Sequence, residues 1–205
     1  MSFFGLRFGL VIATELLVLG GASAGQETTT PKPPVFRITK AYSTVGFSVY
    51  KWMVMKEEGI FRDFEGQIVY DSSRPDLSQI DMTVQAASLD TGNATRDSVL
   101  RSDDFFDIAK YTTLHFVSDK VVPKGGNEIE VSGELTIHGV TKRITIPARI
   151  NGTNRIPGVG TLAGFEATFT IDRTDYGVNG FRWSGGNLSI RKEVTIHLAL
   201  GCVRD

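Results

Sequence analysis

Apolar residues recur at every second position along most of the chain, a pattern that places them on one face of a strand. Seven runs show it: residues 45–50, 80–86, 114–116, 131–138, 144–150, 165–172 and 194–200. Polar residues such as Ser132, Glu134 and Thr136 fill the intervening positions of these runs. The alternation predicts seven or eight half-buried strands.

Turn-forming residues separate the runs, at 72–75, 123–127, 138–139, 151–160 and 177–186. Short turns join strands that run antiparallel to each other. The chain is therefore predicted to be all-β, with an antiparallel sheet whose apolar face must be covered. Either a second sheet covers it or the sheet closes into a barrel, and the pattern alone does not separate the two.

The strand pattern lapses only within residues 91–116, TGNATRDSVLRSDDFFDIAKYTTLHF. Asn93 is a predicted helix N-cap, and Arg96 and Leu100 share a helix face four residues apart. We predict a short helical insert around residues 94–107. The Phe105–Phe106 pair that follows is interpreted as a plug over one end of the barrel, with a movable lid as the alternative.

Three separated motifs resemble the YceI-like family. They are the run TGN..RD..LRS.DFFD..KY...F from Thr91, GELTIHGVTK from Gly133 and GFEATFTIDRTDYGV from Gly164, and the resemblance covers about residues 36–200. It implies an antiparallel lipocalin-like β-barrel of about eight strands that binds a polyisoprenoid lipid. Lys51, Val99 and Thr112 depart from the family's usual residues, which weakens the transfer of head-group residues by analogy.

The N-terminus has the pattern of a secretory signal peptide. Arg7 precedes an apolar run that Glu15 interrupts, and Ala22-Ser23-Ala24 fits a cleavage site after Ala24. An uncleaved anchor is the alternative, but it needs about 20 apolar residues. The predicted organisation is a signal peptide at 1–24, a polar, proline-rich leader at 25–34 and a YceI-like barrel domain at 35–203. With the resemblance, this predicts a bacterial protein that is periplasmic or secreted.

Charge and cysteine content exclude some classes of partner. Twenty-two basic and twenty-three acidic side chains give a net charge of −1, so no field-driven attraction to nucleic acid or to an anionic membrane is expected, and nucleic acid is not an expected partner. Cys202 is the only cysteine, so no intrachain disulfide forms. Its place near the C-terminus suggests an unpaired thiol in a terminal tail, with an intermolecular disulfide as the alternative.

The residues that catalysis would need do not form a recognisable pattern. His115, His138 and His197 are the only histidines, and their phase places them on polar faces or at a turn. No metal-ligand spacing, nucleophile elbow or phosphate-binding loop is present in the sequence. We therefore predict a non-enzymatic protein that requires no cofactor.

The inward faces of such a barrel carry almost only apolar residues, which either fill the core or line a cavity. The residues leave both open, and the resemblance favours a cavity. The predicted lining is Val45, Phe47, Val49, Trp52, Met53, Met82, Val84, Leu114, Phe116, Leu135, Ile137, Ile144, Ile146, Phe165, Phe169, Ile171, Val194, Ile196 and Leu198. Trp52 and Met53, with Val54 and Met55, break the alternation and are interpreted as an adaptable rim or pocket wall, with an ordinary bend of partly buried side chains as the alternative.

Charged residues near the helical insert are candidates for holding a lipid head group. They are Lys51, Arg96, Asp97 and Arg101. An arginine presents a planar fork that suits a diphosphate. The alternative is that these charges pair with one another on the surface of the insert.

These observations lead to one hypothesis with two alternatives. The first is an exported, non-catalytic carrier that binds an isoprenoid lipid, such as a prenyl quinone or a prenyl diphosphate. The resemblance also allows a homodimer and a transient contact with a membrane or a membrane enzyme. The alternatives are a ligand-free structural or interaction module with a filled core, and an enzyme acting on a lipid head group through Arg96 and Asp97.

Overall fold

The computed structural model describes residues 33–180 and 190–204. The predicted signal peptide, most of the predicted leader and part of the turn at 177–186 lie outside these residues. The described strands are β1 (Val35–Ile38), β2 (Thr44–Lys51), β3 (Met55–Phe61), β4 (Phe64–Val69), β5 (Gln79–Gln85), β6 (Leu89–Asp90), β7 (Thr113–Gly125), β8 (Glu128–Ile137), β9 (Val140–Ile156), β10 (Gly160–Asp172) and β11 (Ile190–Arg204). One α-helix, α1 (Ala94–Arg101), and four 3-10 turns complete the described part of the chain.

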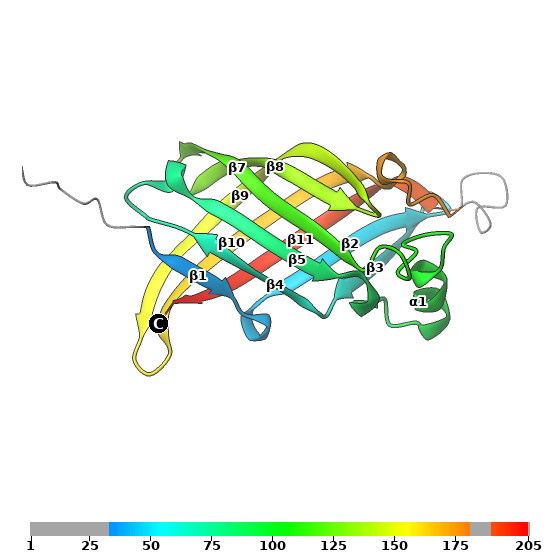
Figure 1. Cartoon of the computed structure of the whole chain (residues 1–205), viewed down its shortest axis with the longest axis horizontal. Helices are drawn as coiled ribbons and strands as arrows, with labels where there is room; N and C mark the ends of the chain where they lie inside the picture. Colours follow the sequence, from blue (N-terminus) through cyan, green and yellow to red (C-terminus); the bar gives the residue numbers. More distant parts are fainter. Residues whose placement is uncertain (1–32, 181–189, 205) are drawn as a thin grey trace, which may run out of the picture. The chain divides into compact units, whose positions relative to one another are not determined.

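The eleven strands form one antiparallel sheet that closes on itself where β1 pairs with β11 (Figure 1). β1 and β2 both pair with β11, at different heights along it. Together they therefore occupy one strand position of the barrel, which we call a stave. β3 and β4 form a second such stave, and β5 and β6 a third. Counted this way, the barrel has eight staves, which confirms the predicted fold and strand number.

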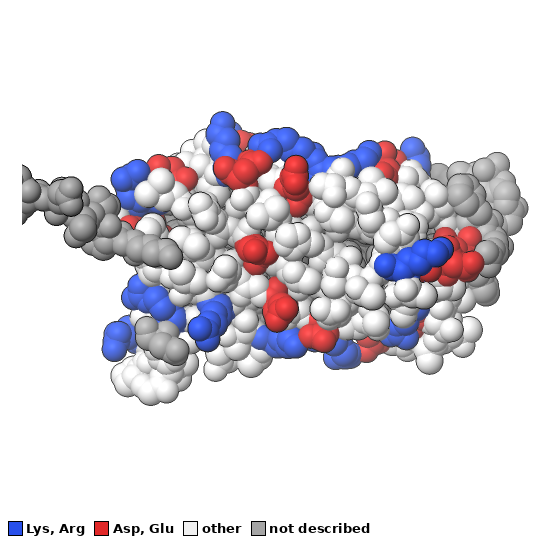
Figure 2. All heavy atoms as spheres, viewed as in Figure 1, with Lys and Arg blue, Asp and Glu red and all other residues white. Residues whose placement is uncertain are grey.

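The inside and outside of the barrel follow the predicted phase. On β11, Leu198, Leu200 and Cys202 lie toward the core, while His197 and Ala199 are exposed. Along the face drawn in Figure 2, basic and acidic side chains are interspersed, and the described residues there form no extended patch of one sign. This distribution agrees with the near-zero net charge.

One end of the barrel is packed solid. Phe36 of β1 and Cys202 of β11 are 2% and 0% exposed, and the Phe36 ring lies 6.3 Å from that of Tyr70. The Tyr70 ring in turn meets Phe165 edge-on at 5.3 Å between centroids. We call this part, formed by Phe36, Tyr70, Phe165 and Cys202, the closed end. In Figure 1 it lies away from α1, where β1 and the end of β11 meet.

The position of Cys202 differs from the predicted terminal tail. It lies within β11, opposite Ile38 of β1 and Ala163 of β10, and its side chain is fully buried. Burial raises the pKa of its thiol to about 12. The tail prediction was wrong because the barrel closes through these last residues, so the thiol is not accessible for an intermolecular disulfide.

The helical insert is shorter than predicted. Asn93 is the N-cap, and its side chain accepts a hydrogen bond from the Arg96 backbone N–H at 3.0 Å, as the sequence indicates. The helix ends at Arg101, because Ser102 is extended and its hydroxyl donates to the Val99 carbonyl. Residues 102–106 form turns instead, and this path buries Phe105. Among the described helices, none combines the length and the apolar character needed to cross a membrane.

Candidate functional site

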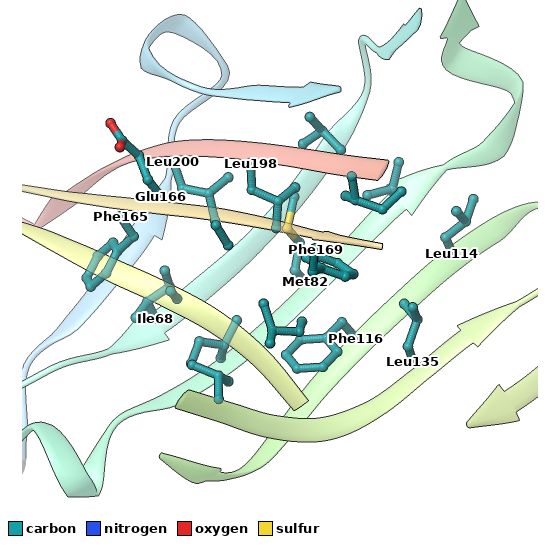
Figure 3. Close-up of a pocket in the computed structure, with 18 of the residues that line it drawn as sticks. Ile68, Met82, Leu114, Phe116, Leu135, Phe165, Glu166, Phe169, Leu198 and Leu200 are labelled. Carbon is teal, nitrogen blue, oxygen red and sulfur yellow. The ribbon is translucent and has the colours of Figure 1, made fainter. Parts of the chain in front are cut away.

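The barrel interior holds a chamber of about 140 Å³ that is enclosed almost only by apolar side chains. Ile68 of β4, Met82 of β5, Phe116 of β7 and Phe169 of β10 are among the side chains that surround it (Figure 3). Glu166 also contributes to its wall, but its carboxylate points away and accepts a hydrogen bond from Asn151 at 2.9 Å. We call this space the inner chamber.

A buried hydroxyl is the exception to the apolar lining. Ser78 precedes β5, is 7% exposed and contributes to the inner chamber. Its Oγ atom has no hydrogen-bond partner within the described part of the protein. Nearby, Ser118 is satisfied, because its Oγ accepts a hydrogen bond from the Ile80 backbone N–H at 2.8 Å. The Ser78 hydroxyl therefore faces an apolar space without a hydrogen bond that would offset the cost of its burial.

A second space, the mouth chamber, has a volume of about 530 Å³. Its apolar wall includes Phe47 and Val49 of β2 and Val194 of β11. Its charged wall consists of Lys51, Glu57, Glu58, Arg96 and Arg173. The two spaces thus differ in chemistry, since only the mouth chamber is lined by several charged groups.

The two chambers adjoin each other, because five residues line both: Phe61, Leu114, Ile137, Ile171 and Ile196. A single strand follows the whole path. On β11, Val194 lines the mouth chamber, Ile196 lines both and Leu200 lines the inner chamber. These positions span about 20 Å along the strand. The interior therefore contains two adjoining hollows, an apolar one at depth and a charged one at the mouth.

Arg96 and Asp97 hold α1 to the segment before it. The Nε and Nη2 atoms of Arg96 donate to the Oγ1 and carbonyl oxygen of Thr91, each at 2.8 Å, and Nη1 forms an ion pair with Glu57. Asp97 is 6% exposed and accepts from the Thr91 backbone N–H at 2.9 Å and from its hydroxyl at 2.5 Å. The TGN..RD motif is thus a hydrogen-bond network centred on Thr91.

This network changes the set of candidate head-group residues. Asp97 faces Thr91, and Arg101 donates to the carbonyl oxygens of Ala87 and Leu89. Neither residue lines a chamber. The head-group prediction for Asp97 and Arg101 therefore does not fit their positions, because backbone groups of the preceding segment already use their polar atoms. Lys51 and Arg96 do line the mouth chamber.

Arg173 is a further charged residue of the mouth chamber, and it lies in the 3-10 turn Arg173–Tyr176. Its guanidinium donates to four backbone carbonyls, those of Val178, Asn179, Ile190 and Arg191. Burial lowers the pKa of this side chain from its ordinary value. Asp172 caps the same turn by accepting from the Thr174 backbone N–H at 2.9 Å. The turn pattern was visible in the sequence, but the long-range carbonyl partners were not.

The predicted lining residues fall mostly within the two chambers, and three do not. Trp52 and Met53 are 60% and 59% exposed and lie beyond the last paired residues of β2 and β3. They project from the hairpin end and form no chamber wall. Ile144 is half-buried opposite Gly133 and lines neither chamber. The other predicted lining residues contribute to one chamber or both.

Phe105 and Phe106 contribute differently to the mouth. Phe105 is 3% exposed and packs with Ile137, Tyr176 and Val178. Phe106 is half-buried and meets the Phe61 ring edge-on at 6.1 Å between centroids. Both rings line the mouth chamber. They therefore narrow this end of the barrel without filling it as the predicted plug would.

His138 and His197 line neither chamber, and His115 lines the inner chamber while its ring pairs outside it. His115 pairs with Asp81 at 2.9 Å and His197 with the Ser48 hydroxyl at 3.2 Å, as expected for polar faces. His138 differs, because its ring packs 4.3 Å from that of Tyr111 and its Nε2 atom is buried without a partner among the described residues. Within residues 33–180 and 190–204, no three potential metal ligands converge.

Comparison with known proteins gives consistent matches. The model of the YceI-like domain matches residues 36–201. A UPF0312 protein of Pseudomonas putida strain W619 is 36% identical over 171 residues, which cover 83% of this chain and 85% of the relative. A UPF0312 protein of Pseudomonas fluorescens is 35% identical over the same shares.

Solved structures have the same architecture. The crystal structure of Burkholderia cenocepacia BcnA superimposes with a TM-score of 0.73 at 27% identity, covering 80% of this chain and 98% of that one. The crystal structure of the Campylobacter jejuni YceI protein gives a TM-score of 0.66 at 27% identity, covering 74% of this chain and 88% of that one. A polyisoprenoid-binding domain from Saccharophagus degradans gives a TM-score of 0.64 at 18% identity, covering 85% of this chain and 100% of that one. This match shows a shared fold.

Proposed function

This chain belongs to the YceI-like family, and from that premise we propose that it is a non-catalytic protein that binds one isoprenoid lipid. The end of the apolar tail lies in the inner chamber, and the rest of the tail and the polar head lie in the mouth chamber. The observation that carries this proposal is that an apolar space and a charged one adjoin each other inside a single barrel and share five lining residues.

The chemistry of the inner chamber restricts what enters it. A sugar or nucleotide placed there would lose its hydrogen bonds to water, at a cost of several kcal/mol for each unpaired polar group (roughly 2–7). A hydrocarbon chain has no such groups and gains from leaving water. The Saccharophagus degradans domain of the same fold, described as polyisoprenoid-binding, supports a lipid of this class.

The volumes set the size of the buried part. The inner chamber, at about 140 Å³, is close to a cavity of ~150 Å³ that holds one benzene ring. By that measure the two chambers together accommodate on the order of 25 carbon atoms, or about five isoprene units. A longer tail must displace flexible side chains such as Met82 or extend beyond the mouth.

The mouth favours a neutral head group over a diphosphate. Arg96 is already bonded to Thr91 and Glu57, and Arg173 is bonded to four carbonyls. Lys51 is the basic mouth residue whose ammonium group meets an aromatic ring, that of Trp52, instead of a carboxylate or a carbonyl. Because the two arginines that line the chamber among the described residues, Arg96 and Arg173, both have partners, we place a prenyl quinone ahead of a prenyl diphosphate.

A carrier role outside the cytoplasm completes the proposal. It is supported by the signal-peptide pattern of residues 1–24, which lie outside the described residues. A protein that shields a prenyl quinone from water is useful where that lipid must cross an aqueous compartment. The predicted homodimer is not needed for this role and stays a prediction.

The test is to fill the inner chamber and compare with an equal change outside it. Ala167 of β10 lines the inner chamber, whereas Ala199 of β11 is exposed on the outer face. We expect Ala167→Phe to weaken binding of a benzoquinone with a four-unit isoprenoid tail at least ~10-fold, because the ring takes the space of the tail. Ala199→Phe should bind like the unchanged protein. Equal affinities for all three proteins, or no binding by the unchanged protein in equilibrium dialysis, contradict the proposal.

A further inference from the structure

The hairpin between β2 and β3 ends in four consecutive exposed apolar side chains. Trp52, Met53, Val54 and Met55 are 60%, 59%, 77% and 53% exposed. We call these four residues the apolar tip. In Figure 1 this hairpin ends on the same side of the barrel as α1 and the mouth chamber. Single exposed apolar residues are common on proteins, but a contiguous group marks an interaction site.

The backbone of the tip is unfavourable for the residues it carries. Trp52 and Met53 have φ angles of 49° and 65°, and the Val54 N–H closes the turn by donating to the Lys51 carbonyl at 3.2 Å. A turn with positive φ at both central positions normally contains Asn-Gly, because bulky side chains are strained there. The sequence thus places two large apolar side chains where small polar ones would form the turn more easily. This choice is explained if the side chains themselves have a partner.

Aromatic and basic groups surround the tip in the combination found at membrane interfaces. The Lys51 ammonium lies 4.1 Å from the centre of the Trp52 ring, and the Arg191 guanidinium lies 5.8 Å from that of Tyr50. The nearby acidic residues Glu57 and Glu58 are paired with Arg96 and Lys56. Lys51 and Arg191 therefore remain near the tip without a carboxylate partner among the described residues. Tryptophan and tyrosine prefer the head-group region, and basic side chains there meet anionic lipids.

We propose that the apolar tip inserts into the head-group region of a lipid bilayer that contains anionic lipid. Lys51 contacts Trp52 of the tip and also lines the mouth chamber, and Val49 and Ile190 line the chamber beside it. Insertion of the tip would therefore set the mouth of the chamber against the membrane. A lipid then passes between bilayer and barrel without exposing its tail to water. The purpose of this contact rests on the proposed function, whereas the contact itself does not.

A bilayer fits the tip better than a protein partner does. A standard protein interface uses about 20–30 residues on each side. The apolar tip offers four, on a turn that projects from the hairpin. A bilayer needs no complementary surface, so a short projecting turn with one tryptophan is sufficient for reversible binding.

The experiment replaces the tip with the sequence that its turn geometry prefers. Trp52→Asn with Met53→Gly removes the two large side chains and suits positive φ at both positions. We expect this double variant to melt at an equal or higher temperature and to bind vesicles of phosphatidylcholine and phosphatidylglycerol at least ~10-fold more weakly in co-sedimentation. The matched control is Val159→Ser, which changes another exposed apolar turn residue, 41% exposed, in the β9–β10 hairpin. It should bind vesicles like the unchanged protein.

A depth measurement locates the contact. Replacing Trp183 by phenylalanine leaves Trp52 as the only tryptophan of the chain. Its fluorescence should be quenched by vesicles that carry brominated lipid. Equal vesicle binding by the unchanged protein and the double variant overturns the inference, and so does the absence of binding by both, which would assign the tip to a protein partner.

Quinone binding in vesicle-free solution separates this inference from the proposed function. If the double variant keeps its quinone affinity and loses its vesicle affinity, the tip is a membrane contact. If the unchanged protein binds vesicles through Trp52 but takes up no quinone, the proposed cargo is wrong and the membrane contact stands.

Discussion

The two ends of this barrel are built from the same strands but differ in packing and chemistry. At the closed end, Phe36, Tyr70, Phe165 and Cys202 fill the interior and exclude water. At the other end, the same staves surround a mouth chamber of about 530 Å³ with charged walls and carry an exposed apolar hairpin. Much of the buried apolar surface that stabilises the fold thus lies at one end of the barrel, and the candidate binding surface lies at the other. This separation leaves the mouth free to hold strained turns and unfilled space that a compact core would not tolerate.

The largest expected effect is at the closed end. Phe36→Ala should lower the free energy of unfolding by about 3–5 kcal/mol, because it removes a fully packed ring and leaves a cavity. Phe47→Ala is the matched change at the mouth, where the ring is half-buried and already borders an open chamber. Phe47→Ala should lower the free energy of unfolding by a clearly smaller amount, as measured by urea unfolding. Equal losses would show that the two ends are not different in packing.

Thiol reactivity probes how well each end excludes water. The pKa of Cys202 is raised to about 12 by burial, so at pH 8 the thiolate population falls roughly 1000-fold below that of an ordinary thiol. Native protein should therefore react with a disulfide reagent far more slowly than unfolded protein. A cysteine introduced as Met53→Cys at the apolar tip should react at once. Rapid native labelling of Cys202 would contradict the sealed closed end.

The same pKa sets a pH dependence of stability. The folded state holds Cys202 neutral with a raised pKa. The stability that this burial contributes to the folded state is therefore fully present below the ordinary thiol pKa of roughly 8.5. It is lost as the pH rises from there through about 12. Cys202→Ala should flatten this alkaline decline in urea unfolding measured at several pH values. An unchanged slope would mean that the thiol is not responsible.

A moderate effect is expected where α1 is anchored to the mouth. Asp97→Ala leaves the Thr91 N–H and hydroxyl without their acceptor, which should cost about 1–3 kcal/mol. The loss should be local and appear as faster hydrogen exchange of the α1 amides. Asp97→Asn keeps one acceptor oxygen and serves as the control with a smaller change. A uniform increase of exchange over all strands would instead indicate that α1 stabilises the whole barrel.

The smallest expected effect is at the inner chamber. Ser78→Ala removes a buried hydroxyl that has no partner among the described residues, so the ligand-free protein should gain about 1 kcal/mol or less. Ser118→Ala is the matched change, and it should destabilise the protein because Ser118 accepts from the Ile80 N–H. Thermal unfolding measures both. A loss of stability for Ser78→Ala would show that its hydroxyl has a partner in solution, such as a bound water.

The sequence was most informative where local pattern and tertiary structure coincide. The period of two predicts which residues of β10 and β11 face inward, and Asn93 marks the start of α1, because both depend on neighbouring residues alone. Barrel closure, the splitting of three staves and the burial of Cys202 depend on pairing between distant strands. The family resemblance supplied the barrel, but the alternation itself fits a sandwich equally well.

Side-chain roles at the mouth were harder to predict for the same reason. Asp97 and Arg101 have the composition of a head-group site, yet both are used by backbone groups up to fourteen residues away. Trp52 and Met53 break the strand alternation, which the sequence shows, but their outward direction follows from the turn geometry. Arg173 carried no signal beyond its turn, since its carbonyl partners come from two different segments. Charge patterns indicate where polar networks form but not which groups remain available to a ligand.

Whether the hollow interior holds a lipid is tested most directly by identifying what the folded protein carries. Protein purified from its native host without detergent is extracted with organic solvent, and the extract is analysed by mass spectrometry alongside extracts of the Ala167→Phe variant. We expect an isoprenoid lipid, at up to one molecule per chain, in the unchanged protein and its loss from the variant. A folded, unchanged protein that stays empty even after it is supplied with isoprenoid quinones would contradict the account.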